Sequence, residues 1–123
     1  MKAFASLAIL SLTSLVLLAG CGAPAEKAPP LDGEGRYVIE LTSGNQFSPA
    51  TAKVPQGATV VWKHMGGAPH DVQAKDGSFS SGQVGGIDEE GETFVHQFNE
   101  TGTFPYECHV HSGSGMKGTL TVG

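Results

Sequence analysis

Hydrophobic residues in the C-terminal two thirds of the chain recur at every second position in short runs, and no long stretch keeps a 3.6-residue period. The segment RYVIELTS, for example, places Tyr37, Ile39 and Leu41 on one face. Turn residues such as glycine, proline and aspartate separate the runs. The expected strands are 36–43, 51–54, 58–63, 69–74, 92–98, 102–108 and 116–122. This pattern predicts an all-β fold, an antiparallel β-sandwich of about seven to eight strands.

The first 20 residues have a different pattern, with Lys2 followed by an apolar run over 3–18. This arrangement is typical of a secretory signal peptide, and the run is short for a membrane-spanning helix. The alternative is an uncleaved N-terminal membrane anchor. The sequence LAGC at 18–21 resembles the lipobox of bacterial lipoproteins. That resemblance implies cleavage before Cys21 and lipidation of its thiol. We expect 21–35, rich in proline and alanine, to be the lipidated cysteine and a flexible linker.

Charge and cysteine content narrow the function of the remaining domain, 36–123. It has five basic and nine acidic residues and no basic patch, which argues against nucleic acid as a partner. A monomer is expected. Of the two cysteines in the chain, Cys21 is assigned to lipid, which leaves Cys108 as a lone thiol in an oxidising compartment. Metal ligation would explain such a thiol, and the alternative is a Cys21–Cys108 disulfide.

The segment CHVHSGSGM contains four side chains that can bind a metal, namely Cys108, His109, His111 and Met116. Thiolate, thioether and imidazole together select copper, and two histidines with one cysteine and a distant methionine form an electron-transfer copper site. Side chains alternate along a strand, so His109 should point away from Cys108. The fourth ligand must come from elsewhere. His70 is the favoured candidate for this ligand, and the competing histidines are His64, His96 and His109. For the axial position, Met65 is the alternative to Met116.

The spacing of Cys108, His111 and Met116, with His70 upstream, resembles that of plastocyanin-type cupredoxins, the small blue copper proteins. QFSPATAKVPQGATVVWKH (46–64), GTFPYEC (102–108) and GMKGTLTV (115–122) also resemble segments of that family. The resemblance implies a Greek-key sandwich over 36–123, with one copper bound equatorially by both histidines and Cys108, and axially by Met116. It also implies one-electron transfer through the edge of His111, within an apolar rim formed by Gly66, Gly67, Ala68, Pro69, Val110 and Gly115.

The chain departs from the family pattern after the first histidine ligand. Asp71 follows the first histidine ligand, where the family commonly has an asparagine that ties the two ligand loops together. A carboxylate near the thiolate disfavours the reduced site, so we expect Asp71 to lower the reduction potential or to make it depend on pH.

We therefore expect a membrane-tethered one-electron carrier rather than an enzyme. It would lie on the periplasmic, extracytoplasmic face and shuttle electrons between a donor and an acceptor. The candidate partners are a c-type cytochrome, a membrane oxidase and a bc-type complex. The alternative is a copper-binding and delivery lipoprotein. An enzyme would need a second copper site, for which too few histidines remain. The acidic segment DEEGE (88–92) is either a solvated turn or a docking site for a basic partner.

Overall fold

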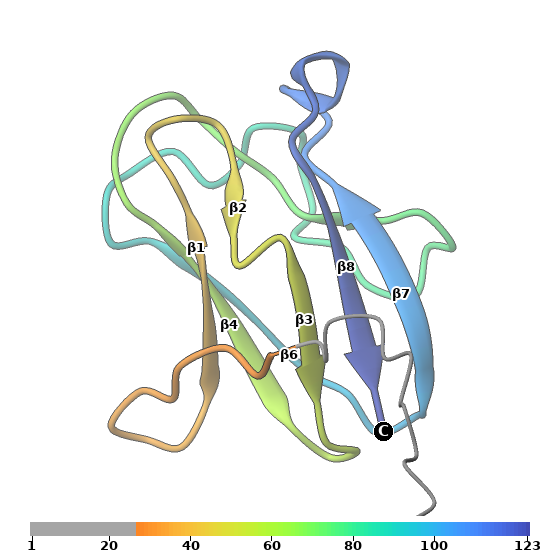
Figure 1. Ribbon diagram of the computed structural model, residues 1–123. Helices are drawn as coiled ribbons and strands as arrows, with labels where there is room; N and C mark the ends of the chain where they lie inside the picture. The colour runs from red at the N-terminus through yellow and green to blue at the C-terminus, as the bar shows by residue number, and fades with distance from the viewer. Residues whose placement is uncertain (1–26) are drawn as a thin grey trace, which may run out of the picture.

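Eight β-strands form two four-stranded sheets in the computed structural model, which describes residues 27–123 (Figure 1). The predicted signal peptide, 1–20, and Cys21 lie outside the described residues. The strands are β1 (Tyr37–Leu41), β2 (Phe47–Ser48), β3 (Thr51–Val54), β4 (Thr59–His64), β5 (Gln73–Ala74), β6 (Thr93–Gln97), β7 (Gly102–Glu107) and β8 (Lys117–Val122). One 3₁₀ turn, Ser112–Ser114, precedes β8. The all-β class and the number of strands are confirmed.

The two sheets are mixed rather than purely antiparallel. One has the order β2-β1-β4-β6 and the other the order β3-β8-β7-β5. The pairs β1·β4 and β3·β8 are parallel, so the prediction of an entirely antiparallel sandwich is wrong at these two pairs. The reason is that alternation of hydrophobic residues specifies which face of a strand is buried, but it does not specify the direction of the neighbouring strand.

The core forms where the inward faces of both sheets meet. Along β8 every second residue is buried, as the sequence pattern predicts. Trp62 on β4 is fully buried and packs against rings from both sheets, with centroid distances of 5.6 Å to Phe79, 5.4 Å to Phe94 and 5.6 Å to Tyr106. Burying side chains of this size contributes about 1.5–3 kcal/mol each. This aromatic core joins the two sheets into one rigid unit.

The N-terminal part of the described chain lies against the domain. The amide of Val38 donates to the carbonyl of Pro30, and the amide of Lys53 donates to the carbonyl of Lys27. Asp32 and Arg36 close the intervening turn with a 2.8 Å ion pair. Residues 27–35, which the sequence assigns to the linker, therefore contact the sandwich.

Within residues 27–123, no helix has the length and apolar character needed to span a bilayer.

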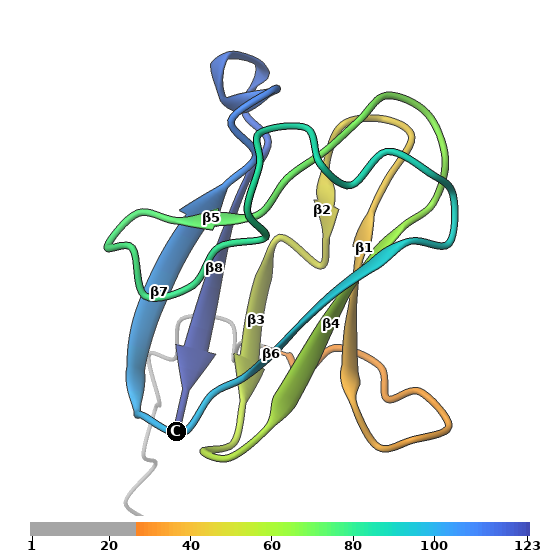
Figure 2. The ribbon, with the colours of Figure 1, turned by 180° about the vertical axis from the view of Figure 1, so that it is seen from behind.

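Loops from both sheets converge at one end of the sandwich. The β1–β2, β4–β5 and β7–β8 connections all lie at this end, opposite the C-terminus, in both ribbon views (Figures 1 and 2). The segment 69–74 contributes only two residues to a strand, because its first part forms an isolated bridge instead. The sheets therefore place three loops, distant in sequence, side by side.

Candidate metal centre

Cys108 lies directly after β7, at the start of a short loop that returns to β8. The two ends of this loop are joined because the Cys108 amide donates to the carbonyl of Met116 at 3.1 Å, which extends the β7·β8 pairing. Inside the loop, the amides of His111 and Met116 donate to the carbonyls of Cys108 and His111, each at 3.2 Å. Gly115 adopts a φ of 90°, which suits glycine and reverses the chain. These hydrogen bonds hold Cys108, His111 and Met116, three of the candidate ligands, in one closed turn.

His70 comes from the β4–β5 connection and is fixed by its backbone. Its amide donates to the carbonyl of Ile87 at 2.8 Å, and its carbonyl accepts from the Ile87 amide at 2.9 Å. The ring Nε2 lies 3.2 Å from the carbonyl oxygen of Thr42. Since a carbonyl only accepts, Nε2 carries the proton, and Nδ1 is left with a free lone pair. The ring is therefore held in the tautomer that can bind a metal through Nδ1.

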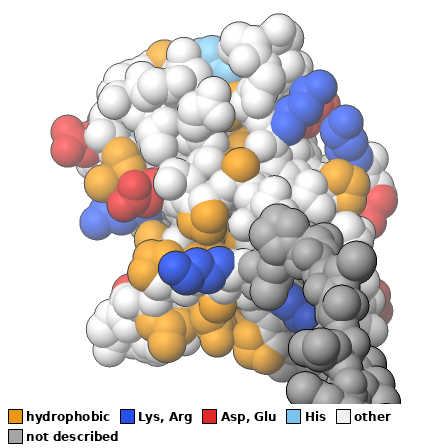
Figure 3. Space-filling model, viewed as in Figure 1, with side chains coloured by type: hydrophobic (Ala, Val, Ile, Leu, Met, Phe, Trp, Pro, Cys, Tyr) orange, Lys and Arg blue, Asp and Glu red, His pale blue; other side chains and the backbone are white. Residues whose placement is uncertain are grey.

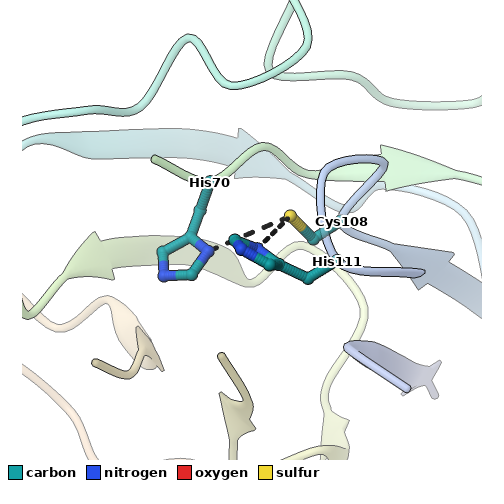
Figure 4. A group of neighbouring side chains, drawn as sticks. All are labelled: His70, Cys108 and His111. Atoms are coloured by element: carbon teal, nitrogen blue, oxygen red, sulfur yellow. Dashed lines mark hydrogen bonds between the residues drawn. The ribbon is translucent and has the colours of Figure 1, made fainter. Parts of the chain in front are cut away.

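Three donor atoms converge between these two loops. Cys108 Sγ lies 3.9 Å from His70 Nδ1 and 3.6 Å from His111 Nδ1 (Figure 4). The three ligand atoms all lie within 4.8 Å of one another. Metal–nitrogen bonds of about 2.0 Å and a metal–thiolate bond of about 2.3 Å, at about 120°, would place sulfur and nitrogen about 3.7 Å apart. The donor set thus fits one ion in a near-trigonal plane.

Met116 is fully buried beside this triad. Its backbone contacts both other residues of the loop, through the Cys108 amide and the His111 carbonyl. A thioether is a soft donor that suits copper. Two residues of the triad are therefore hydrogen bonded to the backbone of Met116, whose thioether stays the predicted weak fourth ligand.

Burial shapes the protonation of the triad. His70 and Cys108 are fully buried, whereas His111 is partly exposed. Burial lowers the pKa of His70, which keeps its imidazole neutral and able to coordinate. Burial also raises the pKa of the Cys108 thiol, so a bound metal must displace its proton. Metal affinity should consequently fall as the pH is lowered.

Asp71 ties the two ligand loops together. Its side chain is fully buried, and its Oδ1 accepts from the Cys108 thiol at 3.2 Å and from the Val110 amide at 3.4 Å. Its Oδ2 accepts from the Gln73 side-chain amide at 3.0 Å. Asp71 therefore bridges loops in the way that the sequence resemblance implies for asparagine, with a carboxyl group at the sulfur.

The competing histidines and Met65 lie outside the triad. His64 is buried, and both of its ring nitrogens lie within hydrogen-bonding distance of backbone atoms. His96, on β6, packs against aromatic rings, and its ring centroid lies 4.8 Å from that of Phe98. His109 is exposed and lies 3.6 Å from Glu107, as strand alternation predicts. Met65 is 39% exposed. Among the described residues, only His70, Cys108 and His111 form a group that could hold a metal.

Val110 and Pro69, two of the expected rim residues, are exposed and lie close together beside the triad. Val110 is 44% exposed, and Gly85 lies between Val110 and Pro69, since a Cβ on Gly85 would sit 3.4 Å and 3.6 Å from their side chains. Val84, the residue before Gly85, is 55% exposed. In Figure 3 the histidine surface at this end lies among uncharged groups, and charged side chains lie farther down the sides. Sequence reasoning missed Val84 and Gly85, although a lone valine in a polar glycine-rich loop was a usable signal.

The acidic segment forms a turn beside this rim. Glu92 closes the turn by accepting from the amides of Asp88 and Glu89 at 2.9 and 3.1 Å, and these bonds lower its pKa. Asp88, Glu89 and Glu90 remain exposed. Gly66 is one of the rim residues that the family resemblance implies, and a Cβ on it would lie 3.6 Å from a carboxyl oxygen of Glu90, so the turn lies beside this part of the rim.

Comparison with known proteins agrees with this geometry. Residues 37–123 match the family model described as copper binding proteins, plastocyanin/azurin family. Plastocyanin of Scenedesmus fuscus is 32% identical over 62% of this chain and 85% of its own. Halocyanin of Natronomonas pharaonis is 34% identical over 73% of this chain, which spans 58% of the halocyanin sequence.

Solved structures share the fold. A purple cupredoxin from Nitrosopumilus maritimus, at 27% identity, has a TM-score of 0.57 and covers 70% of this chain and 98% of its own. A copper-containing nitrite reductase from Thermus scotoductus, at 22% identity and a TM-score of 0.60, covers 82% of this chain and 27% of its own, and this likeness shows the fold alone. With the matched family model and the triad of Cys108, His70 and His111, the chain belongs to the plastocyanin/azurin family of copper-binding proteins, the cupredoxins.

Proposed function

We propose that this protein is a membrane-tethered one-electron carrier that holds one copper ion with His70, Cys108, His111 and Met116 and shuttles electrons between redox proteins. The observation that carries the proposal is the triad of His70, Cys108 and His111, with its donor atoms already within 4.8 Å of one another. When bound, copper would supply a one-electron couple between Cu(II) and Cu(I). The family to which the chain belongs binds copper.

The protein's contribution is to keep the ligands in place. Each of His70, Cys108 and His111 is held by backbone hydrogen bonds to a second segment or across the loop. Electron transfer is fast when little has to move between the two oxidation states, because no reorganisation is then needed at the moment of transfer. A rigid sandwich with the ligands on two loops, each fixed by backbone hydrogen bonds, meets this need.

The partly exposed His111 gives the buried site a route to the surface. Cys108, His70 and Met116 are fully buried, so among the four proposed ligands only His111 reaches solvent. The apolar rim of Val110, Pro69 and Val84 around it can exclude water when a partner docks. We propose that electrons enter or leave through the His111 edge.

The first prediction concerns colour. The domain loaded with Cu(II) should absorb intensely in the visible range, because thiolate-to-copper charge transfer requires a short bond from Cys108. Cys108→Ser should abolish this band, since it replaces the only described thiol. His109→Ala is the matched control and should keep the band, because His109 is exposed and outside the triad.

The result that would sink the carrier proposal is a colourless copper complex. Ready loss of copper to a weak chelator would do the same, and it would favour the delivery lipoprotein instead. Both outcomes can be read by visible absorption during a chelator titration.

The second prediction concerns Asp71, which we propose lowers the reduction potential. Its carboxyl oxygen lies 3.2 Å from Sγ, where a negative charge opposes the additional electron of the reduced site. Asp71→Asn should raise the midpoint potential by about 60 mV or more, which is a factor of about ten for a one-electron couple. Asp76→Asn is the control and should leave the potential nearly unchanged, because Asp76 is exposed and its charge is screened by solvent and salt. An unchanged potential in Asp71→Asn across the pH range, measured by voltammetry, would refute this role.

The third prediction concerns the partner. We propose that the donor or acceptor is a basic redox protein, such as a c-type cytochrome, or a membrane oxidase or bc-type complex. The chain carries a net charge of −5, and its acidic turn borders the rim. Neutralising Asp88, Glu89 and Glu90 to amides should slow electron transfer to a basic cytochrome and flatten its salt dependence. Glu92 stays unchanged because it closes the turn. An unaltered salt dependence would identify the segment as a solvated turn only.

The fourth prediction concerns the tether. We propose that lipid on Cys21 anchors the protein at the extracytoplasmic face of the membrane, as the signal-peptide pattern and the LAGC sequence indicate. Cys21→Ser should move the protein from the membrane fraction to the soluble fraction of a bacterial host. Equal membrane association of both forms would contradict lipid anchoring at this residue.

A further inference from the structure

We infer that His64 is a positioning residue for the metal centre: its imidazole is the template around which the loop 65–69 folds, and it thereby fixes the ligand His70. This inference rests on the proposed copper site. His64 ends β4 and is only 1% exposed, although it lies outside the donor triad. A buried polar ring of this kind is stable only if its nitrogens have partners.

Both ring nitrogens of His64 are bonded to the loop that follows it. Nδ1 accepts from the Gly66 amide at 3.0 Å, and Nε2 lies 2.9 Å from the carbonyl oxygen of Ala68. Because an amide donates and a carbonyl accepts, the ring is in the neutral form with its proton on Nε2. The His64 side chain therefore supplies hydrogen-bond partners to the Gly66 amide and the Ala68 carbonyl, in place of backbone partners.

The loop has a shape that needs such support. Gly66 and Gly67 have φ values of +98° and +93°, which lie in the left-handed region that favours glycine. A Cβ on Gly67 would come within 3.1 Å of the Cα of Ser43, so the loop packs closely on the β1–β2 connection. Pro69 and His70 follow at once. The position of the imidazole of His64 thus determines where the chain enters His70.

The His64 ring also contacts the ligand directly. The ring centroids of His64 and His70 lie 5.2 Å apart at 43°, and those of His70 and His111 lie 5.0 Å apart. His70 is therefore confined between His64 and His111, with its Nε2 directed to Thr42. Residues that orient a metal ligand typically change metal affinity tenfold to a hundredfold when they are replaced.

The test compares two histidine-to-phenylalanine substitutions. His64→Phe keeps a buried ring but removes both hydrogen bonds to the loop. His96→Phe is the matched control, because His96 is a partly buried ring on the neighbouring strand β6, packed 5.4 Å from Phe79. Within residues 27–123 the His96 ring makes no hydrogen bond comparable to those of His64. A third variant, His64→Gln, places an amide where it can still donate to the Ala68 carbonyl.

Two readouts are expected to change in His64→Phe. Cu(II) affinity, measured by competition with a chelator, should fall about tenfold to a hundredfold, with an altered electron paramagnetic resonance spectrum. In the metal-free protein, hydrogen exchange of the Gly66 amide should accelerate at least about tenfold, because its acceptor is gone. His96→Phe should stay within about twofold of the wild type in both. His64→Gln should recover part of the lost copper affinity.

The result that would overturn the inference is a folded His64→Phe protein with wild-type copper affinity, spectrum and Gly66 exchange. If His64→Phe does not fold, His64→Gln decides, and wild-type values of affinity and Gly66 exchange in that variant would overturn the template role. If wild-type protein binds Cu(II) without the charge-transfer band, the proposed function fails. In that case Gly66 exchange in the metal-free variants still tests the template independently.

Discussion

The structure depends on one constraint, which is that a thiolate and two imidazoles from loops almost 40 residues apart must meet at bonding distance from a single ion. The β7·β8 pairing meets half of this constraint by joining Cys108 to Met116 at the base of their loop. The His70–Ile87 bridge meets the other half by fixing the second loop. The aromatic core around Trp62 locks the two sheets together, so neither half can shift independently.

Polar groups around the triad connect these halves. Asp71 contacts the sulfur of Cys108 and the amide of Val110, so one carboxyl group spans both loops. His64 supports the loop that leads to His70 from the opposite side. The two residues act differently, because Asp71 places charge at the sulfur whereas the His64 ring is neutral. We therefore expect Asp71 to affect mainly the potential, and His64 mainly the position of the ligand.

The sequence was sufficient for the features that depend on local pattern. Alternation in β1 and β8 predicted which side chains are buried, and the alternation argument also turned His109 outward. Features that depend on long-range closure could not be predicted. Strand direction in the β1·β4 and β3·β8 pairs is one example. Another is His64, whose bonds to Gly66 and Ala68 exist only once the loop has closed. The role of Asp71 at the sulfur was anticipated from a resemblance rather than from pattern.

The central claim is that the protein holds the ligands in place before copper arrives and keeps them there in both oxidation states. Crystal structures of the metal-free, Cu(I) and Cu(II) forms test this most directly. We expect the distances from Cys108 Sγ to His70 Nδ1 and to His111 Nδ1, which are 3.9 and 3.6 Å in this structure, to change by less than about 0.5 Å among the three forms. Movement of Cys108 or His70 by more than about 1 Å between these forms would contradict it.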